Sequence, residues 1–135
     1  MDDFYVNLSS KATVFTKNSA NNFTVQFKPE IPLNGTFDVA LVEIFMPTPK
    51  IKELKAKYLL ANFISSSIVG ESSHRLLKVI YSYDNHVQFS SEYIKVTDSF
   101  LFLDTLTFEF VDDESNCIEF EEGNVEIRLH FMKNW

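Results

Sequence analysis

The side chains best suited to chemistry are three histidines and one cysteine, which are His74, His86, His130 and Cys117. Their spacing matches no zinc-ligand pattern, and the sequence contains neither a glycine-rich phosphate loop nor a nucleophile elbow. His86 falls in an expected hairpin turn, and alternation places His130 on the outward face of the last expected strand. We therefore predict that the protein is not an enzyme and has no catalytic, cofactor-binding or metal-binding residues.

Cys117 is the only cysteine, so the chain can form no internal disulfide. A lone thiol gives no reason to expect an oxidising compartment. We interpret Cys117 as a small, half-buried hydrophobic residue in a short strand, because no catalytic base is expected beside it.

Carboxylates dominate the C-terminal part of the chain. No Lys or Arg occurs between Val96 and Ile127, where the acidic residues are Asp98, Asp104, Glu109, Asp112, Asp113, Glu114, Glu119, Glu121, Glu122 and Glu126. Calcium prefers oxygen ligands, so the turns around Asp112 and Glu121 leave a calcium site open as an alternative, although they lack the order and the central glycine of an EF-hand.

The formal net charge is −7, and a basic pole opposes the acidic segment. This pole consists of Lys50, Lys52, Lys55 and Lys57. An acidic surface repels phosphate, so we expect no nucleic-acid partner. Two interpretations of the poles stay open: they are solvated faces that maintain solubility, or they meet between neighbouring copies of the chain.

The length of 135 residues, with 14 Phe, suits one domain that spans residues 1–135. No apolar run reaches the roughly 18 residues needed to cross a bilayer. The N-terminal residues MDDFYV lack the basic-then-apolar form of a signal peptide. We expect a soluble protein that is synthesised in the cytoplasm and has no membrane partner.

Alternation of apolar and polar residues predicts eight or nine strands. The segment 37–46 is apolar on both faces apart from Asp38 and Glu43, which indicates a central strand. The segment 65–73 is expected to be a loop of small residues. The expected strands cover residues 4–8, 13–15, 23–27, 37–46, 77–83, 87–96 with a bulge near Ser90, 100–110, 117–120 and 125–131.

One segment carries helix signals. Thr48 is suited to an N-cap and Pro49 to the first helical position, and Ile51, Leu54 and Tyr58 follow at helical spacing. The fold class is therefore predicted to be all-β, a single jelly-roll-like antiparallel β-sandwich of about eight strands with one short helix. Its predicted core is Phe23, Val25, Phe27, Val39, Leu41, Leu106, Phe108, Phe110, Val125, Ile127, Leu129 and Phe131.

Two segments together resemble a known family. The first is NNFTVQFKPEIPLNGTFDVALVEIFMP at residues 21–47, and the second comprises LTFEF, IEF, Gly123 and VEIRLHF near the C-terminus. They are similar to the opening and the end of penton-type minor capsid proteins of Polinton or Maverick DNA transposons and adinto-like viruses. Those proteins are jelly rolls that close the five-fold vertices of icosahedral particles. The resemblance covers both ends of the chain and not its middle.

The resemblance implies a structural capsid subunit of the virion, which assembles with itself, with a pentamer favoured, and with a major capsid protein. Assembly would be head-to-tail, with apolar flanks buried and opposite charges matched around an axis. Two alternatives stay open. One is a β-sandwich recognition module, such as a receptor- or glycan-binding capsid decoration, and the other is a host protein that has adopted the fold for another interaction.

Overall fold

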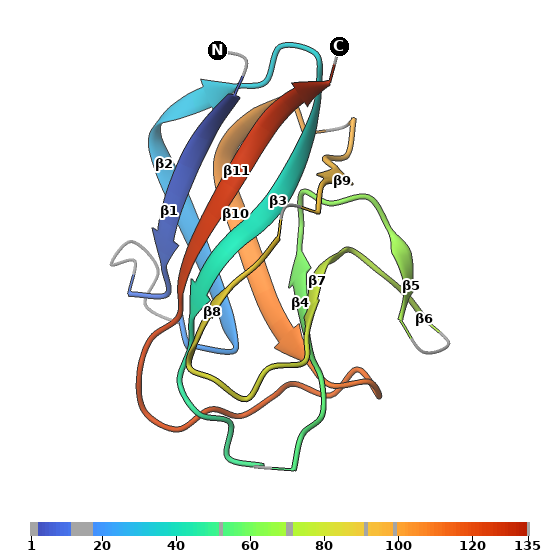
Figure 1. Ribbon diagram of the computed structural model, residues 1–135. Coiled ribbons are helices and arrows are strands. Elements are labelled where there is room, and N and C mark those ends of the chain that lie inside the picture. The colour runs from blue at the N-terminus through green and yellow to red at the C-terminus, as the bar shows by residue number, and fades with distance from the viewer. Residues whose placement is uncertain are drawn as a thin grey trace.

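The computed structural model describes residues 3–11, 18–51, 53–69, 72–90, 92–98 and 100–134. Two antiparallel sheets pack face to face to form a β-sandwich (Figure 1). Sheet A has the order β1 (Asp3–Ser9), β11 (Glu126–Asn134), β3 (Thr36–Phe45) and β8 (His86–Gln88), and β9 (Ile94–Lys95) also pairs with β3. Sheet B has the order β2 (Asn22–Pro32), β10 (Phe102–Val111), β4 (Lys57–Ala61) and β7 (Leu76–Ile80).

The strand order is that of a jelly roll. The pairs β1 with β11, β2 with β10, β3 with β8, and β4 with β7 are nested from the ends of the chain inward. Successive nested pairs alternate between the two sheets. This alternation is the strand connectivity of a jelly roll. This order confirms the predicted fold class, and β3 is central in sheet A as its two apolar faces indicated.

The predicted helix is wrong, because the described residues form no helix. The backbone after Pro47 instead bonds to the segment near the C-terminus: the Lys50 amide donates to the Glu119 carbonyl at 2.9 Å, and the Glu121 amide donates to the Thr48 carbonyl at 2.7 Å. Tyr58 then belongs to β4, which lies between β10 and β7. Long-range pairing has overridden a local helix preference.

Other expected elements differ in detail. The expected strand 13–15 lies outside the described residues. The expected loop 65–73 contains the hairpin β5 (Ser67–Val69) and β6 (Ser72–His74). The expected strand 87–96 is divided into β8 and β9, and His86 belongs to β8 rather than to the turn. Residues 117–120 make only isolated bridges at Cys117 and Phe120.

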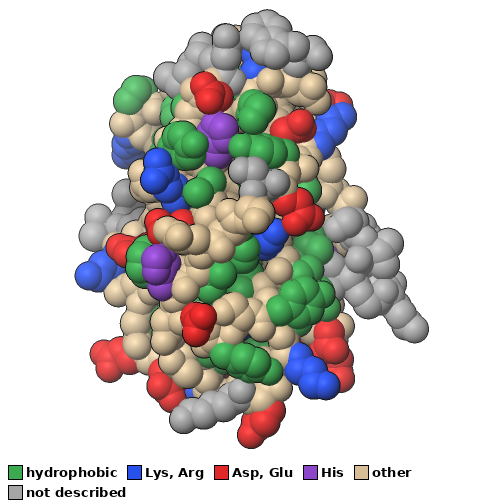
Figure 2. Space-filling view, viewed as in Figure 1, with side chains coloured by type: hydrophobic (Ala, Val, Ile, Leu, Met, Phe, Trp, Pro, Cys, Tyr) green, Lys and Arg blue, Asp and Glu red, His purple; other side chains and the backbone are tan. Residues whose placement is uncertain are grey.

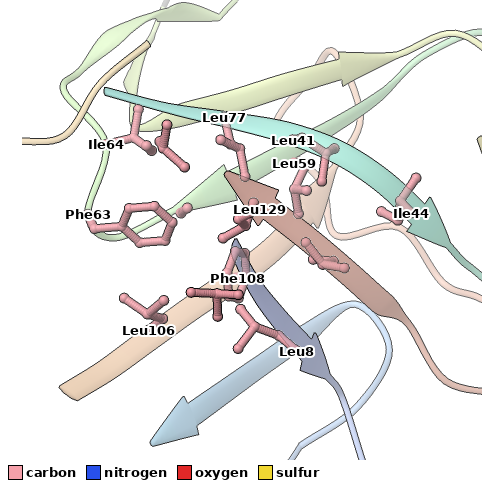
Figure 3. Close-up of a cluster of buried hydrophobic side chains, with 14 of the residues drawn as sticks. Leu8, Leu41, Ile44, Leu59, Phe63, Ile64, Leu77, Leu106, Phe108 and Leu129 are labelled. Atoms are coloured by element: carbon pink, nitrogen blue, oxygen red, sulfur yellow. The ribbon is translucent and has the colours of Figure 1, made fainter. Parts of the chain in front are cut away.

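The core is built from the inward faces of both sheets (Figure 3). Phe63, which is fully buried after β4, contacts Phe108 of sheet B edge-on at 5.8 Å between ring centroids and Phe131 of sheet A at 5.8 Å. The predicted core residues are confirmed as buried, except that Val25 and Phe27 are only partly buried. The burial of each such Phe or Leu side chain contributes roughly 1.5–3 kcal/mol to the free energy of unfolding.

Phe102 departs from the expected alternation. A period of two counted back from Phe108 and Leu106 would place Phe102 on the inward face, yet it is 46% exposed, while Leu103 is fully buried. The register of β10 against β2 shifts between Leu103 and Thr105, and this irregularity reverses which residues face the core.

Phe108 and Phe102 provide a matched test of the core. We expect Phe108→Ala to lower the free energy of unfolding by about 3–5 kcal/mol, because it leaves a cavity between the sheets. Phe102→Ala removes the same side chain from an exposed position on the same strand, and we expect a loss below about 1 kcal/mol. Urea denaturation of both variants measures the difference, and equal losses would contradict this assignment of the core.

Candidate functional site

The outer face of sheet A carries polar and aromatic side chains in rows across the strands. Figure 2 views this face, where hydrophobic, acidic, basic and histidine side chains are interspersed. The register of β1, β11, β3 and the short strands defines four rows, which are Ser9–Glu126–Phe45–His86, Asn7–Arg128–Glu43–Gln88, Tyr5–His130–Ala40 and Asp3–Met132–Asp38–Lys95. Neighbours in one row are close enough to interact.

His130 is held by three segments. Its Nδ1 lies 2.6 Å from the Tyr93 hydroxyl, its Nε2 lies 3.1 Å from Asp3 Oδ2, and the Tyr5 ring stacks on it at 4.4 Å. The prediction that His130 points outward from β11 holds, but these contacts leave it only 7% exposed. An acid, an imidazole and a hydroxyl in line also occur in catalytic relays, which additionally need a substrate cleft at the hydroxyl. Here the contacts tie β1 and β11 to the segment before β9.

His86 fixes a second group on the same face. Its Nε2 lies 2.7 Å from Glu43 Oε2, and its ring stacks on Phe45 with centroids 4.0 Å apart and planes 1° apart. The Gln88 amide donates to the same Glu43 oxygen at 3.1 Å. The hydrogen bond from His86, then that from Gln88, lowers the pKa of Glu43, and the charge of Arg128 adds to the effect. Glu43 is therefore held as a carboxylate.

A shallow groove of about 370 Å³ lies between these rows. Its polar and aromatic lining side chains are those of Asn7, Ser9, Glu43, Phe45, Glu126 and Arg128. The Arg128 guanidinium lies 4.4 Å from the centre of the Tyr5 ring, so it is positioned by a cation–π contact. Two carboxylates and one guanidinium can exchange hydrogen bonds with a polar ligand, and their net negative charge disfavours an anion. We call this the face groove.

A larger groove of about 660 Å³ lies at one side of the sandwich, where β7 of sheet B faces the broken edge formed by β8 and β9. Its apolar lining comes from Ile64, Leu76, Leu77, Val79, Tyr81, Phe89 and Ile94. Lys78 crosses it, with its Nζ 5.0 Å from the centre of the Phe89 ring and 2.9 Å from Glu92 Oε2. We call this the side groove.

Lys57 does not belong to the predicted basic pole, because it is buried. It lies on β4 with its side chain only 2% exposed, and its Nζ donates to the Ser82 carbonyl at 2.9 Å. Burial lowers the pKa of this ammonium group. Lys57 occupies the inward position beside Leu59 in the alternation of β4, so it cannot belong to an exposed cluster. Lys52 lies outside the described residues.

The two charge poles also meet within one chain. Lys50 Nζ lies 3.9 Å from Glu119 Oε2, and both side chains are well exposed. An exposed pair at this distance contributes about 0–1 kcal/mol. The segments that carry the poles are instead joined by the backbone hydrogen bonds between residues 48–50 and 119–121.

The acidic turn at residues 112–116 is organised by its own side chains. Asp112 Oδ1 accepts hydrogen bonds from the amides of Glu114 and Asn116, both at 2.9 Å, and Ser115 has a φ of 67°. His74 Nε2 lies 3.0 Å from the Ser115 hydroxyl, which links β6 to this turn. Cys117 is exposed rather than half-buried, because Ile118 takes the inward position beside it.

The sequence predicted the outward position of His130 but not the partners of the histidines. Asp3, Tyr5 and Tyr93 surround His130 from positions far along the chain, and only the strand order brings them together. Within the described ranges, no group of three or more His, Cys, Asp or Glu residues is placed to hold a metal ion. The same residues include no helix long and apolar enough to span a membrane.

The fold and these surfaces define an antiparallel jelly-roll β-sandwich with a polar face groove and an apolar side groove. No protein-family model, no curated protein and no solved structure matches the chain. The architecture and the surface chemistry therefore carry the functional argument.

The Glu43–His86 pair predicts a measurable titration. Because the hydrogen bond from His86 contributes most to the lowered pKa of Glu43, His86→Ala should move that pKa back toward its ordinary value. Stability from the pair is present above the unfolded-state pKa and is lost as the pH falls through the lowered one. Carboxyl NMR titration measures the pKa. An unchanged pKa in His86→Ala, with His74→Ala as the control, would contradict this role.

The lowered pKa of Lys57 makes the free energy of unfolding depend on pH. The unfolded chain keeps this proton up to the ordinary lysine pKa, while the folded chain releases it at lower pH, so stability should rise with pH between the two values. Lys57→Met should remove this rise and increase the stability at pH 7 by about 1–3 kcal/mol.

Urea denaturation between pH 7 and pH 10 tests this expectation. The exposed Lys55 provides the control, since Lys55→Met should leave both the stability and its pH dependence nearly unchanged. A destabilised Lys57→Met at pH 7 would show instead that the hydrogen bond to Ser82 outweighs the cost of burying the ammonium group.

Proposed function

We propose that the chain is a structural capsid subunit, a penton-like minor capsid protein that assembles with itself at the vertices of a virus or a virus-derived mobile element. The observation that carries the proposal is the nested strand order in two antiparallel sheets, of five and four strands. Jelly rolls of this kind serve as shell-forming domains of viral capsids. The fold alone does not determine function, and the resemblance of both chain ends to penton-type proteins adds to the argument.

The chemistry of the surface suits a structural role in the virion. The histidines hold strands together, and Lys57 is enclosed in the core. Exposed apolar side chains occur at several places, including Tyr81, Leu101 and Phe102. Apolar contacts of this kind supply most of the energy of subunit association, while charged pairs mainly set its register. The proposed partners are further copies of the chain and a major capsid protein.

A second candidate, a recognition module, is favoured by the face groove. Phe45 is 42% exposed and stands beside fixed hydrogen-bonding groups of Glu43 and Arg128. An aromatic ring with carboxylate and guanidinium neighbours is suited to a polar ligand that also has an apolar face, such as a saccharide. A capsid decoration that binds a receptor would use this groove without requiring a ring.

The mass in solution tests the proposal. One copy has a mass of 15.6 kDa, so a ring of five copies would give about 78 kDa. We expect native mass spectrometry and light scattering to detect this ring at micromolar concentrations. Assembly should be weaker at high salt, because salt screens the charged pairs that set the register. A protein that stays monomeric at every concentration and salt level would overturn the vertex role and favour the recognition module.

A further inference from the structure

The two edges of sheet B lie on opposite sides of the sandwich (Figure 1). Among the described residues, β2 forms one edge and pairs only with β10, while β7 forms the other and pairs only with β4. A subunit that joins its neighbours in a closed ring needs two different, complementary surfaces on its two sides. The edges of sheet B are placed where such surfaces are required.

The edge at β7 presents a hollow. The side groove lies where the facing edge of sheet A is interrupted between β8 and β9, and Phe89 of the intervening segment forms part of its lining. Val79 is half-buried and Tyr81 is 68% exposed along the rim. Apolar surface in a groove beside an unpaired strand edge is typical of a docking site for another polypeptide.

The edge at β2 presents a projection. Leu103 pairs with Ile31 and Thr105 pairs with Gln26, so the four residues 27–30 of β2 stand opposite Asp104 alone. The extra residues bulge from the edge, and Lys28, Pro29 and Glu30 are exposed. Apolar surface continues beside the projection, where Phe102 pairs with Pro32 and Leu101 is 63% exposed. We call residues 28–30 the β2 knob.

The charges of knob and groove are complementary. The side groove carries the ammonium groups of Lys78 and Lys95 and the carboxylate of Glu92, a net positive charge in a chain whose net charge is −7. The knob carries Lys28 and Glu30 on either side of Pro29. Lys78 and Glu92 already pair with each other at 2.9 Å, so Lys95 is the groove lysine that Glu30 can face. Lys95 also has Asp98 at 3.3 Å, but both side chains are well exposed, so this pair restrains Lys95 only weakly.

We propose that the side groove is the docking site for the β2 knob of a second copy of this chain, in a head-to-tail contact. Pro29 and the neighbouring apolar surface cover the groove near Tyr81, and the alternating charges set the register. The inference rests on the self-assembly in the proposed function, because it names the surfaces by which one copy meets the next.

Single substitutions at exposed positions test each surface without disturbing the core. Tyr81→Arg places a bulky cation on the rim of the side groove, and Tyr83→Arg is its control, since Tyr83 is 67% exposed two residues away and does not line the groove. Glu30→Arg reverses the acidic charge of the knob, and Asp113→Arg makes the same reversal in the exposed turn 112–116. We expect the first variant of each pair to lose the ring and each control to retain it.

Mixing the two defective variants decides between a head-to-tail contact and a symmetric one. Tyr81→Arg retains a normal knob, and Glu30→Arg retains a normal groove, so together they can form one intact contact and no second. We expect the mixture to give a species of two copies, about 31 kDa from two chains of 15.6 kDa, while each variant alone stays monomeric. Native mass spectrometry detects this species directly.

The outcomes separate the inference from the proposed function. A ring that persists in both Tyr81→Arg and Glu30→Arg overturns the inference and leaves the vertex role standing. Loss of the ring in Tyr83→Arg or Asp113→Arg to the same extent also overturns it, because the effect would then follow charge rather than position. A wild-type chain that forms no ring at any concentration overturns the proposed function itself.

Discussion

The structure depends on the pairing of strands that are far apart in the sequence. β1 pairs with β11 through seven residue pairs from Asp3–Met132 to Ser9–Glu126, and the other nested pairs follow inside it. Closing such long loops costs entropy that the local sequence does not repay. The cost is offset where the paired strands turn their Phe and Leu side chains toward the opposite sheet, so pairing and core formation depend on one another.

The same pairing gives the two faces of sheet A different chemistry. Inward, Leu129 and Phe131 pack against the aromatic cluster around Phe63. Outward, Arg128 and His130 join rows of polar and aromatic residues from β1 and β3. Because the side-chain period of a strand is two, one register determines both faces, and a shift of one residue would exchange them. The histidine contacts on the outer face therefore oppose slippage of the same register that buries the core.

Alternation in the sequence was sufficient to predict the all-β sandwich and most of its core. It failed where long-range contacts decide the outcome. The helix signals at Thr48 and Pro49 are local, whereas the backbone there bonds to residues 119–121. Lys57 was assigned to the basic pole from its charge alone, although its position in β4 is an inward one. The surroundings of His130 and both grooves require the strand order, which alternation does not contain.

The edge strands of an open sandwich can pair with other chains. The two edges of sheet B limit such pairing in different ways. At β2, the bulge at residues 27–30 and the prolines at 29 and 32 interrupt a regular row of backbone donors, which hinders uncontrolled strand pairing. At β7, Lys78 extends across the gap between the sheets, and its charge makes strand pairing at the otherwise apolar groove less favourable. The bulge hinders the pairing of β2 with another β2, and the charge of Lys78 hinders the pairing of β7 with another β7. In the contact we propose, the bulge of one copy would fill the groove of the next and Glu30 would neutralise an ammonium group there, so the asymmetry would favour ordered head-to-tail association over aggregation.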